Sequence, residues 1–91
     1  MTFDWDEKKR KANLQRHGLD FRDAERIFEN ETLLLIDDRF DYGEIRYVTF
    51  GMLRNIVVAL VYTEQDESVR VISLRRATPN EEKEYFKGIR D

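Results

Sequence analysis

The sequence predicts a small α+β domain in which two helices precede an antiparallel sheet of four strands and one helix follows it. The apolar residues recur with helical spacing up to about residue 29 and then form extended runs from residue 32 to residue 74. Short connections join these runs, and such connections suit antiparallel neighbours because parallel strands need long crossovers. A length of 91 residues predicts a single domain, residues 1–91.

Two helices are predicted near the N-terminus. The first spans about residues 5–17, with Asp4 as its N-cap and Gly18 as the left-handed residue that ends it. The second spans about residues 21–29, with Asp20 as its N-cap. A further short strand is allowed before the first helix.

The last helix carries the clearest local signal in the sequence. Thr78 is the expected N-cap, a proline follows it at the first helical position, and Glu81 completes a capping box. The helix is expected over about residues 79–88, with Tyr85 and Phe86 facing inward. We expect Tyr85 to be a core residue rather than a catalytic one.

Four extended segments make the predicted sheet: residues 32–36, 45–50, 56–62 and 69–74. Turn-rich stretches at residues 37–43, 51–54 and 63–68 separate them. The third segment is apolar on both faces, which predicts a central strand covered on both sides for most of its length. The helices are expected to cover one face of the sheet, leaving the opposite face for chemistry.

Strand alternation assigns the residues of the last strand to faces. It places Ser73 and Arg75 on one face together with Val71, and Ile72 and Leu74 on the other, along with Arg70 and Arg76. Because Ile72 and Leu74 suit the helix-covered core, we expect Ser73 and Arg75 to face outward.

Composition excludes several classes of protein. The chain has no cysteine, one histidine and no phosphate-binding glycine motif, so we expect no metal and no cofactor. The longest apolar run has seven residues, far short of a membrane span, and the first residues lack a secretory signal. We therefore expect a cytoplasmic protein with no membrane partner.

Charge is distributed unevenly along the chain, whose net charge is −3. Residues 1–18 carry five Lys/Arg and three Asp/Glu, a net charge of +2, whereas residues 19–43 carry three and eight, a net charge of −5. The acidic total argues against broad electrostatic binding of nucleic acid, although a local basic groove is compatible with it.

Arginines on and near the strands are the main candidates for chemistry, because guanidinium binds phosphate through two parallel hydrogen bonds. The candidates are Arg46, Arg54, Arg70, Arg75 and Arg76, with the basic run 8–11, Arg16 and His17 on the first helix. The alternative is that these arginines form ordinary surface ion pairs. His17 has two interpretations as well: a cation that complements the C-terminus of its helix, or a general acid or base.

Several blocks of sequence together resemble the BrnT family. The blocks are residues 3–6, residues 13–21 with Ala24 and Phe28, residues 43–46, residues 61–64, and residues 70–78 followed by Glu81 and Tyr85. They cover nearly the whole chain in the order and spacing of the family. The chain departs from the family pattern at Leu74, where alanine is usual, and at residues 53–55, where a Gly-Arg pair is usual.

The resemblance implies a RelE-like fold and a ribonuclease toxin of a type II toxin–antitoxin module, which cuts RNA without metal and so inhibits translation. It implies a BrnA-like antitoxin as partner, contact with DNA only through that antitoxin, and a dimer or a heterotetramer with it.

Cleavage would follow attack of a ribose 2′-OH on its own phosphate, which needs a base, an acid and positive charge. The candidates for catalysis are His17, Arg46, Glu64 and Arg75, and those for RNA binding are Lys9, Arg54, Arg70, Ser73 and Arg76. Which residue is the acid and which the base stays open.

Two other classes of function also stay open. One is a catalytically weak or inactive toxin-like protein that acts mainly as antitoxin partner and co-repressor, which the acidic stretch at residues 20–41 favours. The other is a stand-alone nucleic-acid-binding module, which ranks last because no helix-turn-helix, zinc knuckle or RRM motif is present.

Overall fold

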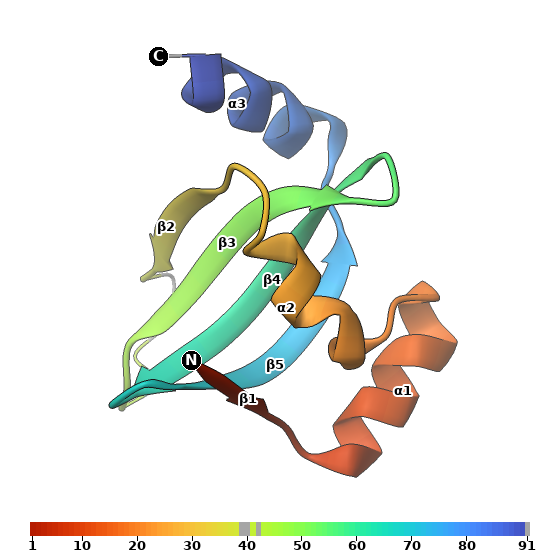
Figure 1. The fold of residues 1–91 in the computed structure, drawn as a ribbon, viewed down its shortest axis with the longest axis vertical. Helices are drawn as coiled ribbons and strands as arrows, with labels where there is room; N and C mark the ends of the chain where they lie inside the picture. The colour runs from red at the N-terminus through yellow and green to blue at the C-terminus, as the bar shows by residue number, and fades with distance from the viewer. Residues whose placement is uncertain (39–40, 42, 91) are drawn as a thin grey trace.

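The computed structural model describes residues 1–38, 41 and 43–90. Five strands form one mixed sheet in the order β1-β5-β4-β3-β2, and helices pack against it (Figure 1). The elements are β1 (Thr2–Asp4), α1 (Glu7–His17), a 3₁₀ turn η1 (Phe21–Asp23), α2 (Ala24–Ile27), β2 (Leu33–Asp37), β3 (Arg46–Leu53), β4 (Ile56–Gln65), β5 (Ser68–Arg76) and α3 (Pro79–Arg90).

The α+β class is confirmed, and the short strand allowed before the first helix is present as β1, so the sheet is mixed and five-stranded rather than purely antiparallel. The short N-terminal segment forms β1, which pairs with β5 in parallel, whereas the other neighbouring pairs are antiparallel. No parallel pair was expected, because short connections join the strands predicted from the sequence. The parallel pair arises because α1, η1, α2 and three strands separate β1 from β5 and provide the long crossover that parallel strands need.

Both N-terminal helices begin or end differently from the prediction. The N-cap of α1 is Asp6, whose carboxylate accepts hydrogen bonds from the backbone amides of Lys8 and Lys9, whereas Asp4 belongs to β1. Gly18 ends α1 with a φ of 70°, as expected. The second helical segment is shorter than predicted: Asp20 caps η1, and α2 follows with four residues.

The strands β3 and β4 are longer than predicted and leave a hairpin turn of two residues. Arg54 and Asn55 form this turn with φ values of 49° and 71°, and such two-residue turns require positive φ at both positions. At the other end of the sheet, β4 and β5 extend to a turn at residues 66–67. The predicted turn at residues 37–43 lies partly outside the described residues.

Helices cover both faces of the sheet, which corrects the expectation of a single covered face. On one face, which we call the α1/α2 face, Phe21 and Ile27 pack with Leu60 and Leu74 of the sheet. On the opposite face, which we call the α3 face, Tyr85 packs in a cluster with Phe50, Val57, Ala59 and Ala77. Figure 1 shows α2 in front of the strands and α3 beyond the upper end of the sheet.

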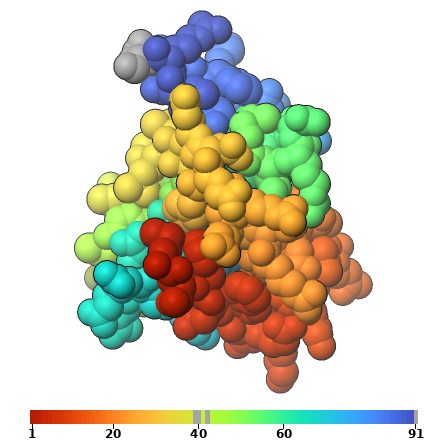
Figure 2. Space-filling view, viewed as in Figure 1, coloured from red at the N-terminus to blue at the C-terminus, as the bar shows by residue number. Residues whose placement is uncertain are grey.

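Space-filling representation shows how completely the α1/α2 face is covered. The N-terminal segments, in red and orange, hide most of the strands in this view, and β2, in yellow, lies along the border of the molecule (Figure 2). The central strand β4 is buried from Val57 to Leu60, which confirms the predicted coverage on both sides. On α3, Tyr85 is buried as expected, but Phe86 is 40% exposed and does not face inward.

A β-bulge in β5 changes the predicted alternation of its side chains. Val61 is opposite Ser73, but the next residue of β4, Tyr62, is opposite Val71, so Ile72 is the extra residue. Val71 is consequently buried in the α1/α2 core, and Ile72 lines pockets outside it, the reverse of the prediction for these two residues. Beyond the bulge, Leu74 faces the core, and Ser73 and Arg75 face away from it as expected.

None of the helices in the described ranges is long and apolar enough to cross a membrane.

Candidate functional site

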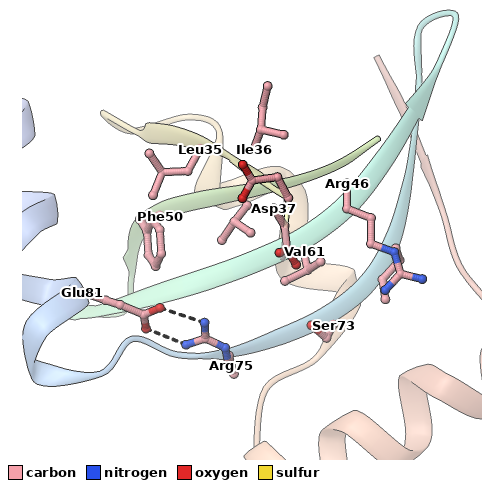
Figure 3. A pocket seen from close by; sticks show the side chains of 12 residues that line it. Leu35, Ile36, Asp37, Arg46, Phe50, Val61, Ser73, Arg75 and Glu81 are labelled. Atoms are coloured by element: carbon pink, nitrogen blue, oxygen red, sulfur yellow. Dashed lines mark hydrogen bonds and ion pairs between the residues drawn. The ribbon is translucent and has the colours of Figure 1, made fainter. Parts of the chain in front are cut away.

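A pocket of about 360 Å³ lies on the α3 face, where four strands and the start of α3 meet (Figure 3). Its lining consists of Leu35, Ile36, Asp37, Asp38, Arg46, Val48, Phe50, Val61, Ile72, Ser73, Arg75 and Glu81. The pocket therefore brings together three of the predicted site residues, Arg46, Ser73 and Arg75, from β3 and β5. Apolar side chains of the central strands form the surface between the two arginines.

Arg75 is held by a two-point contact with Glu81. Its two terminal guanidinium nitrogens donate hydrogen bonds of 2.7 and 2.9 Å to the two carboxylate oxygens of Glu81 (Figure 3). This geometry fixes the plane of the guanidinium as well as its position. The Arg75 guanidinium lowers the pKa of Glu81 from 4.5 to about 2, and a hydrogen bond from the backbone of Thr78 adds to the effect.

The same carboxylate forms the capping box of α3. The backbone amide of Thr78 donates to Glu81 at 2.9 Å, and the Glu81 amide donates to the Thr78 hydroxyl at 3.2 Å. The capping box predicted from the sequence is thus confirmed. The start of α3 and the orientation of Arg75 consequently depend on one side chain.

Arg46 occupies the opposite side of the pocket. It is the first residue of β3 and lies in register with Asp37 of β2. The register of the sheet places Ser73 and Val61 between Arg46 and Arg75, and Figure 3 shows the same arrangement. Two guanidinium groups therefore border a single pocket from two strands.

A second hollow, of about 230 Å³, adjoins this pocket across β5. It is lined by Lys9, Ala12, Asn13, Arg16, His17, Ile72 and Ser73, and it shares Ile72 and Ser73 with the first pocket. His17 and two basic side chains of α1 thus line a hollow that adjoins the arginine pocket. Sequence separation alone gave no indication that α1 lies beside this part of β5.

Asn13 fixes α1 against β5 at this place. Its buried side-chain amide donates to the carbonyl oxygens of Leu19 and Leu74, at 3.0 and 2.8 Å, and its oxygen accepts from the Leu74 amide at 3.1 Å. Asn13 therefore satisfies both backbone groups of Leu74, between Ser73 and Arg75. This structural role was not recognised in the sequence.

The model of the ribonuclease toxin BrnT, of type II toxin–antitoxin systems, matches residues 5–81. The chain belongs to the BrnT toxin family. The matched range contains both arginines of the pocket, His17 and Glu81, so the family assignment covers the whole candidate site. A search of curated proteins finds no match to the chain.

Membership of the BrnT family makes the chain a ribonuclease toxin of a type II module, for which the partner is an antitoxin protein. A ribonuclease binds and cleaves phosphodiester bonds of RNA. A pocket bordered by two guanidinium groups is suited to hold a phosphate.

Four of the predicted site residues lie outside these two pockets. Glu64 lines a separate hollow of about 300 Å³ near the β4–β5 turn. Arg54 forms an ion pair with Asp23 at 2.7 Å, and Arg70 forms one with Asp4 at 3.2 Å. Arg76 is exposed and lies in register with Val58, whose side chain belongs to the α1/α2 core.

Three acidic residues of the BrnT pocket were not predicted as site residues: Asp37, Asp38 and Glu81. Glu81 was predicted as part of the capping box of α3, but its contact with Arg75 depends on where α3 lies relative to β5. Asp37 and Asp38 follow the apolar run of β2, a position that suits either a turn or a site. Counting charged side chains, the pocket lining contains two cations and three anions.

No group of three or more His, Asp or Glu side chains is arranged to hold a metal ion within residues 1–38, 41 and 43–90. The side chains that line the two pockets include arginines, which can stabilise negative charge, and a histidine and carboxylates, which can transfer protons.

Proposed function

We propose that this BrnT chain is a metal-independent endoribonuclease that cuts RNA by attack of a ribose 2′-OH on the adjacent phosphate, and that it thereby inhibits translation. A BrnA-like antitoxin neutralises it. The observation that carries the proposal is the pocket bordered by Arg46 and Arg75, which shares Ser73 with the hollow that His17 lines.

In the proposed step, the 2′-oxygen forms a new bond to phosphorus while the bond from phosphorus to the 5′-oxygen breaks. The 2′-OH gives its proton to a base, the 5′-oxygen receives a proton from an acid, and a 2′,3′-cyclic phosphate remains. Negative charge builds up on the phosphate oxygens in the transition state. Arg75 and Arg46 stabilise this charge, and Glu81 keeps the Arg75 guanidinium in a fixed orientation.

His17 is the group that we propose for one of the two proton transfers. Histidine is the commonest general acid or base near neutral pH, and the hollow that His17 lines borders the arginine pocket. Glu64 lines a hollow that shares no residue with that pocket. Besides Glu81, the carboxylates that line the pocket belong to Asp37 and Asp38, and we propose them as candidates for the second transfer.

The charged side chains around the pocket favour an RNA backbone that runs from the pocket toward α1 rather than toward β2. Lys9, Arg16 and His17 lie on the α1 side, whereas Asp37 and Asp38 lie on the β2 side and repel phosphate. We propose that RNA crosses β5 over Ser73, with Lys9 contacting a neighbouring phosphate. Three other arginines remain for contact with longer RNA or with the antitoxin, or for structural ion pairs: Arg54, Arg70 and Arg76.

Substitution of Arg75 tests the proposal directly. Arg75→Ala should lower the rate of RNA cleavage by about 10²–10³-fold, because a transition-state contact is lost. It should lower the free energy of unfolding by about 1–2 kcal/mol, because the hydrogen bonds to Glu81 are lost. Arg26→Ala is the matched control, since Arg26 is exposed on α2 and its pair with Asp23 is long, at 3.9 Å.

Circular dichroism and thermal melting of the same preparations show whether each variant is folded. A folded Arg75→Ala protein with full activity contradicts the proposed role of Arg75. His17→Gln should also lower cleavage, by about 10²-fold, and full activity of that variant assigns the proton transfer to another residue.

A second candidate function follows from the acidic side chains of the pocket. An inactive BrnT protein that serves mainly as antitoxin partner and co-repressor would not need a positively charged pocket, and three acids against two arginines favour this alternative. Absence of RNA cleavage by folded protein that binds its antitoxin would support it.

A further inference from the structure

The border strand β2 exposes an unusual amount of apolar surface. Leu34, Leu35 and Ile36 are consecutive, and their exposed fractions are 55%, 50% and 61%. In the sheet order, β2 pairs with β3 on one side and stands at the end of the sheet on the other. The apolar surface therefore lies on a strand whose outer backbone edge has no partner strand within the described parts of the chain.

Border strands of stable monomers are normally protected against pairing with another chain. Short length, charged side chains, proline and bulges are the usual means. β1, at the other end of the sheet, has three residues, and one of them is charged. β2 has five residues, of which four in succession are apolar, and its register with β3 is regular. Its outer edge is suited to accept a further strand.

The charge around β2 indicates what kind of strand would bind there. Residues 29–38 contain four acids and no lysine or arginine. An apolar hollow of about 190 Å³ between β2 and α3 is lined by Leu33, Leu35 and Phe50, with Glu81 and Glu84 at its side. A second copy of the chain would place these acids opposite acids, which is unfavourable. A basic strand with apolar residues would match both the charge and the surface.

We propose that β2 is the docking site of the antitoxin, and that an extended segment of the antitoxin, with apolar residues alternating with lysine or arginine, adds to β2 as a sixth strand. This inference rests on the proposed function, in which an antitoxin binds and neutralises the chain. Leu35, Ile36 and Asp37 also line the arginine pocket. The added strand would therefore lie beside that pocket, and its cations would meet Asp37 and Asp38. Binding at β2 would neutralise the toxin by restricting access of RNA.

Hydrogen exchange of the complex tests where the antitoxin binds. The full-length chain is compared alone and in complex with the BrnA-like antitoxin of its own module. Backbone amides of residues 33–37 should exchange at least tenfold more slowly in the complex. Slower exchange confined to other strands or helices, with β2 unchanged, would overturn the proposal.

Two matched substitutions test the same surface. Leu34 lies outside the pocket lining, and Leu34→Arg should weaken antitoxin binding at least tenfold through repulsion and loss of apolar contact. Leu14→Arg is the control, because Leu14 is a 39% exposed leucine on α1. Both variants should have melting temperatures close to that of the parent protein and should cleave RNA at the rate of the parent. Equal antitoxin binding by Leu34→Arg and Leu14→Arg overturns the proposal.

The remaining outcomes separate the docking site from the proposed function. If the chain alone forms a dimer that Leu34→Arg abolishes, β2 binds a second copy and the proposal fails. If the chain cuts RNA but binds no antitoxin, the docking proposal fails and the nuclease proposal stands. If it binds antitoxin at β2 but cuts no RNA, the docking proposal stands and the nuclease proposal fails.

Discussion

Replacing Glu81 with glutamine separates the two tasks of this side chain. The glutamine side chain keeps an oxygen that can accept the Thr78 amide, so the cap of α3 can persist, but it loses the negative charge that holds Arg75. We expect a folded protein with a less stable junction between β5 and α3. We also expect weaker RNA cleavage, by about tenfold, because the Arg75 guanidinium is no longer held in one orientation.

The size of the stability effect follows from the pKa of Glu81. A fall from 4.5 to about 2 corresponds to at most about 3–4 kcal/mol at neutral pH. The Glu81 and Arg75 side chains are 28% and 33% exposed, so solvent screening reduces the expected loss in Glu81→Gln to about 1–2 kcal/mol. For a domain of this size, that loss lowers the melting temperature by about 5–10 °C.

The pH dependence identifies the group responsible. Because folding lowers the pKa of Glu81, its contribution is present above about pH 4.5 and is lost as the pH falls toward 2. The parent and Glu81→Gln should therefore differ most at neutral pH and converge near pH 2. Arg10 lowers the pKa of Glu7 to about 2 as well, but that contribution is common to both proteins and cancels in the difference.

Glu82→Gln is the control for the loss of a negative charge in the first turn of α3. It should change the melting temperature less than Glu81→Gln and leave RNA cleavage unchanged. The proposed contribution of the Glu81 carboxylate is wrong if the difference in stability between Glu81→Gln and the parent is the same at neutral pH and near pH 2. It is also wrong if Glu82→Gln reproduces the whole effect of Glu81→Gln.

Three further predictions concern the scaffold and the cell. Asn13→Ala should lower the free energy of unfolding by about 2–3 kcal/mol in denaturant titration, because the amide and carbonyl of Leu74 lose their partner; a loss of less than about 0.5 kcal/mol contradicts this. Gly51→Ala should destabilise by about 1–3 kcal/mol, because its Cβ would lie 2.8 Å from the Ile27 Cγ2; an unchanged melting temperature would contradict it. Expression of the chain alone should arrest growth and protein synthesis, and co-expression of the antitoxin should restore them; unimpeded growth with abundant folded protein favours the inactive-partner alternative.

Local signals in the sequence predicted much of the fold. The capping box of α3, the left-handed Gly18 and the apolar run of β4 are properties of neighbouring residues, and the structure confirms each of them. The apolar run also indicated coverage on both faces, yet the helices were assigned to one face. α3 packs on the second face because β4 would otherwise expose Val57 and Ala59.

The parts that were wrong or missed depend on contacts between distant segments. A bulge opposite Val61 and Tyr62 inserts one residue into β5, so simple alternation assigns Val71 and Ile72 to the wrong faces. Alternation remained correct for Ser73 and Arg75 because both lie beyond the bulge. The contact of Arg75 with Glu81 and the approach of α1 to β5 through Asn13 require the folded chain.

Metal-independent attack by the ribose 2′-OH is tested by cleavage of a short RNA with the purified chain in excess EDTA, followed by analysis of the product ends. We expect cleavage that leaves a 2′,3′-cyclic phosphate and a 5′-OH, and no cleavage when the ribose at the cut carries a 2′-deoxy position in place of the 2′-OH. Arg75→Ala, assayed beside it, should show about 10²–10³-fold slower cleavage. Cleavage that is lost in EDTA and restored by Mg²⁺, or cleavage of the 2′-deoxy substrate at the same position, would contradict metal-independent attack by the 2′-OH.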